Sequence, residues 1–180
     1  GVTSMRELFR GAESFNYDIS SWNTASVTDM GSMFYEAYVF NQPIGDWDMS
    51  NVVNVDNMLA HAFRFNQPIG AWDMSSVANM TYMFFEAYAF NQPIGDWNTS
   101  SVTDMRYLFQ YANVFASDIT GWSVPNGADT TGMFDSTTAF LSLFTCPSNN
   151  GPPSTCTSRS DLLRATVAAC LAKDATGACS

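Results

Sequence analysis

The stretch FNQPIGDWNTSSVTDM, residues Phe90–Met105, decides the fold because it recurs along the chain in a fixed register. Phenylalanine returns every 25 residues from position 15 to 140, isoleucine from 19 to 119, and tryptophan from 22 to 122. Self-similarity at such a period is typical of solenoids, in which no single copy buries its apolar face alone and stacked copies share one core. We therefore predict a solenoid of short strands and short helical turns.

Each copy has three predicted parts. Asn41–Trp47 contains proline and glycine around Ile44, which predicts a short strand bounded by turns. Ser50–Val55 predicts a second short extended piece. Met80–Phe90 carries apolar residues at i, i+3, i+4, i+7 and i+10, a spacing that predicts two to three amphipathic helical turns.

Composition excludes several classes of function. The chain has 180 residues, a net charge of −10 and only 13% charged residues. Nucleic acids and anionic membrane surfaces require clustered Lys and Arg, so neither is an expected partner. The longest apolar run is far too short for a membrane span.

The repeats cover residues 1–140 as five to six coils, and the last copy decays from the consensus. The chain opens in the middle of a repeat, which we interpret as a trimmed fragment. Residues 141–158 are rich in Pro and Ser and predict an irregular linker. Residues 159–180 predict a Cys-containing C-terminal helix or cap, with Ser160 as its N-cap.

All the cysteines lie in the last part of the chain, and their spacing fits no zinc pattern. Two disulfides in an oxidising compartment are the preferred interpretation, with all three pairings open. The disulfide candidates are Cys146, Cys156, Cys170 and Cys179.

With the repeat laid out, the segments FNQPIGDWDMSNVVNVDNM and MFFEAYAFNQPIGDWNTSSVTDM resemble the repeat of BspA-like leucine-rich-repeat surface proteins. The resemblance covers about residues 1–140. It implies an α/β solenoid, a right-handed leucine-rich-repeat-like stack, at the cell surface or secreted, with roles in adhesion. The segment TSRSDLLRATVAACLAKDATG is similar to the helix that opens the next block of repeats in longer algal members. The family offers no catalytic residue to carry over.

Two series of residues are predicted to be structural. An asparagine at one fixed coil position predicts a ladder of side-chain amides that satisfy backbone groups of successive coils. The tryptophan series predicts a continuous file through the core. The ladder residues are Asn16, Asn41, Asn66, Asn91, Trp22, Trp47, Trp72, Trp97 and Trp122.

Stacked acidic residues raise the alternative of calcium binding. The series that contains Asp29 and Asp104, and the series that contains Asp48 and Asp73, mix Asp with Asn and lack a glycine-rich, Asp-dense loop. We therefore expect turn and solvation roles, with no metal and no cofactor.

Aromatic residues at matching positions of successive coils are the best binding-face candidates, for sugars or for a protein. They are Tyr35, Tyr38, Phe63, Phe85 and Tyr88. His61, with Glu36 and Glu86 in the adjacent coils, is expected to be a surface residue with favourable charged neighbours rather than a catalytic or metal centre.

Asn79 and Asn98 begin N-glycosylation sequons. With no catalytic motif in the sequence, we predict a non-enzymatic, secreted or cell-surface module that presents a repetitive face to a protein or glycan. A structural subunit that stacks head to tail into filaments is one alternative. A lectin or carbohydrate-active protein is the other.

Overall fold

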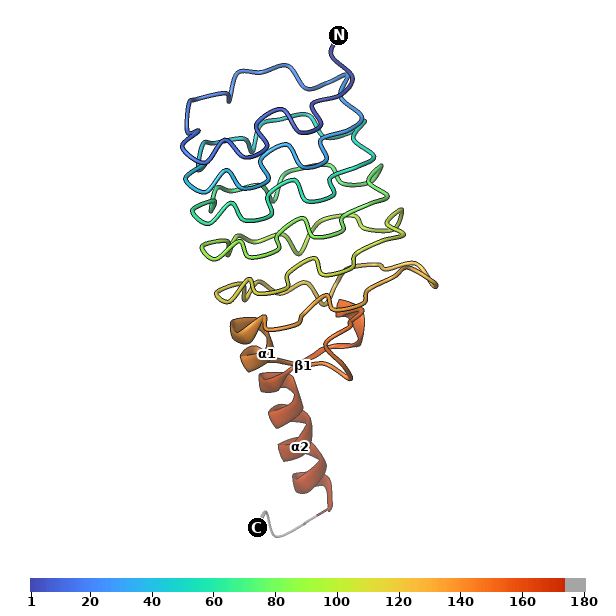
Figure 1. The fold of residues 1–180 in the computed structure, drawn as a ribbon. Coiled ribbons are helices and arrows are strands. Elements are labelled where there is room, and N and C mark those ends of the chain that lie inside the picture. The colour runs from blue at the N-terminus through green and yellow to red at the C-terminus, as the bar shows by residue number, and fades with distance from the viewer. Residues whose placement is uncertain (174–180) are drawn as a thin grey trace.

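The computed structural model describes residues 1–173, and its repeats form a stack of similar coils (Figure 1). Equivalent residues of successive coils pair through isolated parallel β-bridges, each 25 residues from the next. The bridges run through Ser4, Asp29, Asn54, Asn79, Asp104 and Asp129. Together these bridges tie six consecutive passes of the chain into one body.

The predicted helical turns are wrong, and the segments instead are chains of β-turns. In residues 80–90, the amides of Met80, Tyr82 and Phe84 donate to carbonyls of the next coil at 2.9–3.0 Å. Amides between them, such as that of Met83, donate to the carbonyl three residues earlier and close four-residue β-turns within the coil. Because these backbone N–H groups donate to the next coil, they cannot donate to the carbonyl four residues earlier, and no α-helix forms.

The turns also need left-handed backbone at two positions of each coil. Tyr82 has a φ of 56° and Glu86 a φ of 54°, and the equivalent residues of the other coils are also positive. A positive φ at the third position is what a type II turn requires. The apolar spacing survives because such turns still direct every third or fourth side chain inward.

The predicted strand near Ile44 is likewise a turn, in which the Trp47 amide donates to the Ile44 carbonyl at 3.2 Å. The extended piece of each coil lies instead around residues 53–54, where the β-bridge forms. Pro43 has no backbone N–H, so a strand at the predicted position would lack one of its inter-strand hydrogen bonds.

The core consists of columns of aromatic rings that run along the stack. Rings of the series from Phe15 to Phe140 stack on their equivalents with centroids 5.9–6.2 Å apart. A second phenylalanine column packs against the first, as Phe84 does on Phe90 at 4.0 Å. Leu59 replaces phenylalanine in the third coil and is fully buried. These columns bury the apolar side that each coil leaves open.

Buried tryptophans connect successive coils through their indole nitrogens. Trp47, Trp72, Trp97 and Trp122 are 1–4% exposed. Each Nε1–H donates to the carbonyl of the isoleucine 28 residues earlier, at 2.9–3.3 Å. A buried Trp N–H needs a partner, and the preceding coil supplies it.

The C-terminal end of the stack is covered by a short structured segment, where an irregular linker was expected. It comprises α1 (Thr138–Leu143), β1 (Phe144–Thr145), η1 (Pro153–Thr155) and β2 (Thr157–Ser158). β1 and β2 pair antiparallel and bring Cys146 beside Cys156, which form a disulfide. Cys170 is not a free thiol, and Cys179 lies outside the described residues.

This segment satisfies amides that face out of the last coil. The Phe134 amide donates to the Asn149 carbonyl at 2.8 Å, and the Gly132 amide donates to Asn150 Oδ1 at 2.9 Å. In the inner coils the equivalent amides donate to the following coil. The disulfide-linked segment therefore takes the place of a next coil.

Helix α2 spans Arg159–Lys173, within the predicted segment 159–180, and extends away from the stack (Figure 1). Ser160 lies inside the helix, so its prediction as the N-cap is wrong. Residues 161–169 are exposed, with Leu163 65% exposed. The bonds that cap Gly132 and Phe134 of the last coil come from residues 149–150.

Candidate functional site

A continuous group of rings lies on the surface formed by the β-turn segments of the central coils. We call it the aromatic surface. The rings contact one another across coil boundaries and are all partly or well exposed. Its members are Tyr35, Tyr38, His61, Phe63, Tyr82, Phe85, Tyr88, Tyr107 and Tyr111.

Tyr38, Phe63 and Tyr88 form one stacked column of this surface. The ring centroids are 4.8 Å and 5.0 Å apart and the planes are within 17° of parallel. Both faces of the Phe63 ring are therefore covered by its neighbours. Tyr88, at the end of the column, stacks on Phe63 by one face and is 41% exposed.

His61 fills the space between two further rings. Its own coil carries the small, buried Ala60 where the adjacent coils carry Tyr35 and Phe85. The imidazole meets both rings edge-on, with centroids 5.3 Å and 5.0 Å away. Its Nδ1 lies 3.3 Å from Glu86 Oε2.

Glu86 connects His61 to the stacked column. The Tyr88 hydroxyl donates to Glu86 Oε2 at 2.7 Å, and this bond together with partial burial raises the pKa of Tyr88. Burial and the charge of Glu36 raise the pKa of Tyr35. Both tyrosines therefore stay neutral hydrogen-bond donors at physiological pH.

Three tyrosines extend the surface towards the C-terminal coils. Tyr82 stacks on Tyr107 at 4.7 Å and meets Phe85 edge-on, and Phe85 meets Tyr111 at 5.9 Å. Tyr107 also lies over Gly132, where a Cβ atom would collide with its ring.

The structure brings all five predicted binding-face residues together. Sequence reasoning treated His61 separately and did not include Tyr82, Tyr107 or Tyr111. Tyr82 and Tyr107 share one coil position, a signal that would have revealed the second column.

The asparagine series forms a backbone-capping ladder at another edge of the stack. Oδ1 of each asparagine accepts the backbone N–H of the equivalent residue one coil later, at 2.8–2.9 Å. The last bond reaches Ala116, where the series ends.

Both acidic series cap local turns. Asp29 Oδ1 accepts the Gly31 amide at 2.9 Å, and Asp48 Oδ1 accepts the Ser50 amide at 3.0 Å. The pKa of Asp48 is lowered by hydrogen bonds from the Ser50 hydroxyl and amide. Within residues 1–173, no group of three or more His, Cys, Asp or Glu side chains could hold a metal ion.

One ion pair reaches across an entire coil. Arg6 Nη1 lies 2.8 Å from Asp56 Oδ1, and Gly31 between them leaves room for the guanidinium. Burial raises the pKa of Asp56, but hydrogen bonds from Arg6, Asn54 and Asn57 outweigh it and hold that pKa below its ordinary value.

The two sequons differ in accessibility. Asn98 is exposed, with Oδ1 accepting from the Ser100 amide and hydroxyl. Asn79 is half-buried in the β-bridge column, and its Oδ1 accepts from Thr81. Asn98 is therefore the more accessible acceptor.

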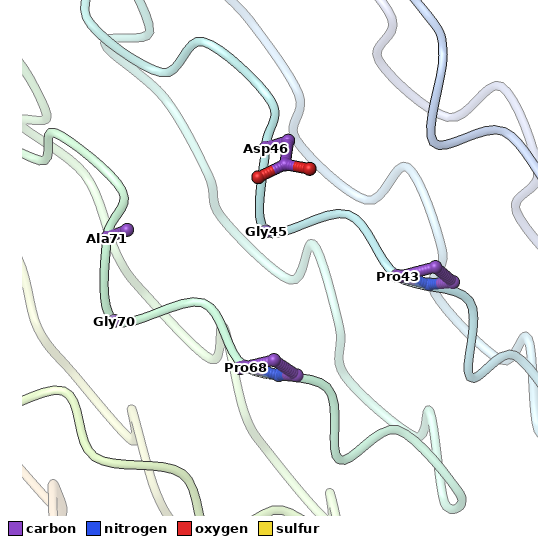
Figure 2. A pocket seen from close by; sticks show the side chains of 6 residues that line it. All are labelled: Pro43, Gly45, Asp46, Pro68, Gly70 and Ala71. Carbon is purple, nitrogen blue, oxygen red and sulfur yellow. The ribbon is translucent and has the colours of Figure 1, made fainter.

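A shallow hollow of about 260 Å³ lies on a different edge of the coils. Figure 2 shows Pro43 and Gly45 of one coil at points that match Pro68 and Gly70 of the next, with Asp46 and Ala71 completing the lining. A Cβ atom on Gly45 would collide with the Pro68 carbonyl oxygen, so the close approach of the coils requires glycine here. The hollow follows from coil packing and gathers few polar groups.

No helix within residues 1–173 is long and apolar enough to cross a membrane. Comparison with known protein families gives two overlapping matches, over residues 1–88 and 46–145, to the family described as "Mycoplasma protein of unknown function, DUF285". No curated protein and no solved structure matches the chain.

Proposed function

This chain belongs to the DUF285 family of Mycoplasma proteins of unknown function, and we propose that it is a secreted or cell-surface, non-catalytic module that binds a protein partner through the aromatic surface. We further propose that its coils form a right-handed, leucine-rich-repeat-like solenoid of the BspA type, built from β-turns and single β-bridges in place of the expected α/β elements. The partner and the role in adhesion belong to the same proposal.

The observation that carries the proposal is a comparison of coils within the chain. The coils on either side of the Tyr38–Phe63–Tyr88 column place Arg10, Glu13, Gln110 and Asn113 at the positions of Tyr35, Tyr38, Phe85 and Tyr88. The backbone bonds are nevertheless equivalent: Ala112 donates to the Phe109 carbonyl at 2.9 Å, and Ala87 to the Phe84 carbonyl at 3.1 Å. Folding of a coil thus does not require a ring at these positions.

Exposed rings without a folding role indicate an interaction surface. Contiguous apolar patches mark binding sites, and tyrosines contribute large contact area at low entropic cost. The Cys146–Cys156 disulfide supports an oxidising compartment, in line with a location outside the cytoplasm.

The geometry of the rings favours a protein over a glycan. A sugar binds by lying flat on an exposed ring face. In the Tyr38–Phe63–Tyr88 column the faces are turned towards one another, so Phe63 offers its edge to solvent. This arrangement weakens the lectin alternative.

The surroundings of His61 support a non-catalytic role. Its Nδ1 faces Glu86, and rings of Tyr35, Phe63 and Phe85 surround the imidazole. Here the histidine has the packing of a structural centre for the aromatic surface.

The closed C-terminal end disfavours head-to-tail filaments. A heterologous stack requires both ends of each subunit to be open. Amides of Gly132 and Phe134 are already bound by Asn150 and Asn149. A second copy would have to displace this disulfide-linked segment.

The test is binding to arrays of defined extracellular proteins and of glycans. We expect binding to at least one protein, and loss of that binding in the triple variant Tyr38→Ser/Phe63→Ser/Tyr88→Ser. A matched control, Tyr17→Ser/Val53→Ser, changes exposed residues outside the aromatic surface and should bind as the wild type does. Circular dichroism verifies that both variants are folded.

Two results would overturn the proposal. Protein binding that persists in the triple variant would place the site elsewhere. Binding to glycans alone, lost in the triple variant, would establish the lectin alternative.

A further inference from the structure

We propose that the partner segment carries arginine, and that a guanidinium stacks on the open face of Tyr88 with its charge facing Glu86. This inference rests on the proposed function and names the chemistry of the partner. It is drawn from a contact that the chain already makes with itself.

That contact joins Arg10 to Tyr35. The Arg10 guanidinium carbon lies 5.0 Å from the centroid of the Tyr35 ring, within the range of a cation–π interaction. Arg10 Nη1 also lies 3.2 Å from a carboxylate oxygen of Glu7. A tyrosine face and a carboxylate together thus hold one guanidinium at the N-terminal border of the aromatic surface.

Tyr88 and Glu86 repeat these two groups at the C-terminal end of the stacked column. The Tyr88 hydroxyl is bound to Glu86 at 2.7 Å, so the carboxylate is fixed at the edge of the ring. Phe63 covers one face of Tyr88, and the equivalent residue of the next coil is the exposed Asn113, not another ring. Tyr88 is 41% exposed and Asn113 is not a ring, so we place the planar cation on this second face.

Charge favours the same occupant. The chain has a net charge of −10, with 7 Lys and Arg against 17 Asp and Glu. Its field attracts basic segments and repels acidic ones, which favours association with a cationic partner. Arginine suits the site better than lysine because its planar group stacks on a ring while it donates to a carboxylate.

The experiment is an NMR titration of the ¹⁵N-labelled chain with three peptides of the same length. They are Ac-Gly-Ser-Arg-Gly-Ser-Arg-Gly-NH₂ and its versions with lysine or citrulline in place of arginine. Lysine controls for charge, and citrulline keeps the shape but removes the charge. Tyr88→Leu removes the ring face, and Tyr17→Leu is the matched control on an exposed tyrosine outside the surface.

We expect the arginine peptide to shift amide resonances at Glu86, Tyr88 and Asn113 and to bind more tightly than the lysine peptide. Its binding to Tyr88→Leu should be about two- to fivefold weaker than to the wild type, as the loss of an exposed cation–π contact predicts. Citrulline should bind more weakly than either. Tyr88→Leu should abolish the preference for arginine over lysine, whereas Tyr17→Leu should retain it.

Equal binding of the arginine and lysine peptides, or shifts confined to other coils, would overturn the inference. The proposed function is tested separately, because an array partner whose binding is lost in the triple variant would establish the aromatic surface. If such a partner were not displaced by excess arginine peptide, the inference on arginine would fail while the proposed function would stand.

Discussion

Replacement of Trp97 by phenylalanine tests whether the tryptophan file holds successive coils together. The indole is 3% exposed, stacks between Trp72 and Trp122 at 6.2 Å and 6.0 Å, and donates to the Ile69 carbonyl at 3.2 Å. The smaller ring removes the donor and leaves a void between two packed coils.

The expected loss of stability has two parts. The Ile69 carbonyl also accepts the Trp72 amide at 3.1 Å, so it keeps one partner, and loss of the indole bond should cost about 1 kcal/mol. A phenyl ring leaves roughly 40 Å³ unfilled, which at about 24 cal/mol per Å³ adds about 1 kcal/mol. Trp97→Phe should therefore destabilise the chain by about 2 kcal/mol.

The assay is urea unfolding followed by far-ultraviolet circular dichroism, with the disulfides kept oxidised. A second variant separates the two parts: 3-benzothienylalanine at position 97 preserves the ring size but lacks the N–H donor. It should lose only the hydrogen-bond part, about 1 kcal/mol, with an unchanged urea dependence. Wild-type stability of this variant would refute the idea that the indole bond connects the coils.

Three further changes test other features of the coils. Gly70→Ala should destabilise by about 1–3 kcal/mol in the same urea assay, because the new Cβ would collide with the Pro93 carbonyl; unchanged stability would show that the coils separate easily. Ser136 is exposed and has a φ of 59°. Ser136→Val should lower the free energy of unfolding by about 1–2 kcal/mol, whereas Ser136→Gly should leave it unchanged. Equal thermal midpoints of the two variants would contradict the left-handed backbone at this position. The lowered pKa of Asp56 stabilises the fold above the ordinary aspartate pKa of about 3.9, and this stabilisation is lost as the pH falls through the lowered value. The free energy of unfolding of Asp56→Asn should therefore depend less on pH in that acidic range. An equal decline in both proteins would exclude this contribution.

The sequence predicts the core residues well because the period alone determines which positions face inward. Met80, Met83, Phe84, Ala87 and Phe90 are all fully buried, as the apolar spacing predicts. The same spacing led to the wrong local conformation. Helical turns and consecutive β-turns both direct every third or fourth side chain to one side, so the spacing does not distinguish them.

The difference lies in where the amides donate, which no single copy specifies. In an isolated helix the Phe84 amide would donate to its own Met80 carbonyl, whereas in the stack it donates to Leu108 of the next coil at 3.0 Å. The next coil offers a backbone carbonyl to every second amide of this segment. The alternation of acceptors then forces the positive φ values at Tyr82 and Glu86.

Ring orientation is the second property that the period leaves open. The 25-residue period predicts that Tyr38, Phe63 and Tyr88 lie on one line. Such a line would bind a sugar if the ring faces pointed to solvent, and would favour a protein if the faces pointed towards one another. The centroid spacing of 4.8–5.0 Å leaves room only for stacking along the line. A column of rings stacked at this spacing covers its own faces, and only its two terminal rings, Tyr38 and Tyr88, keep one face without a stacked ring. A cation on Tyr88 and apolar contact along the ring edges are therefore the two modes of binding that this geometry favours.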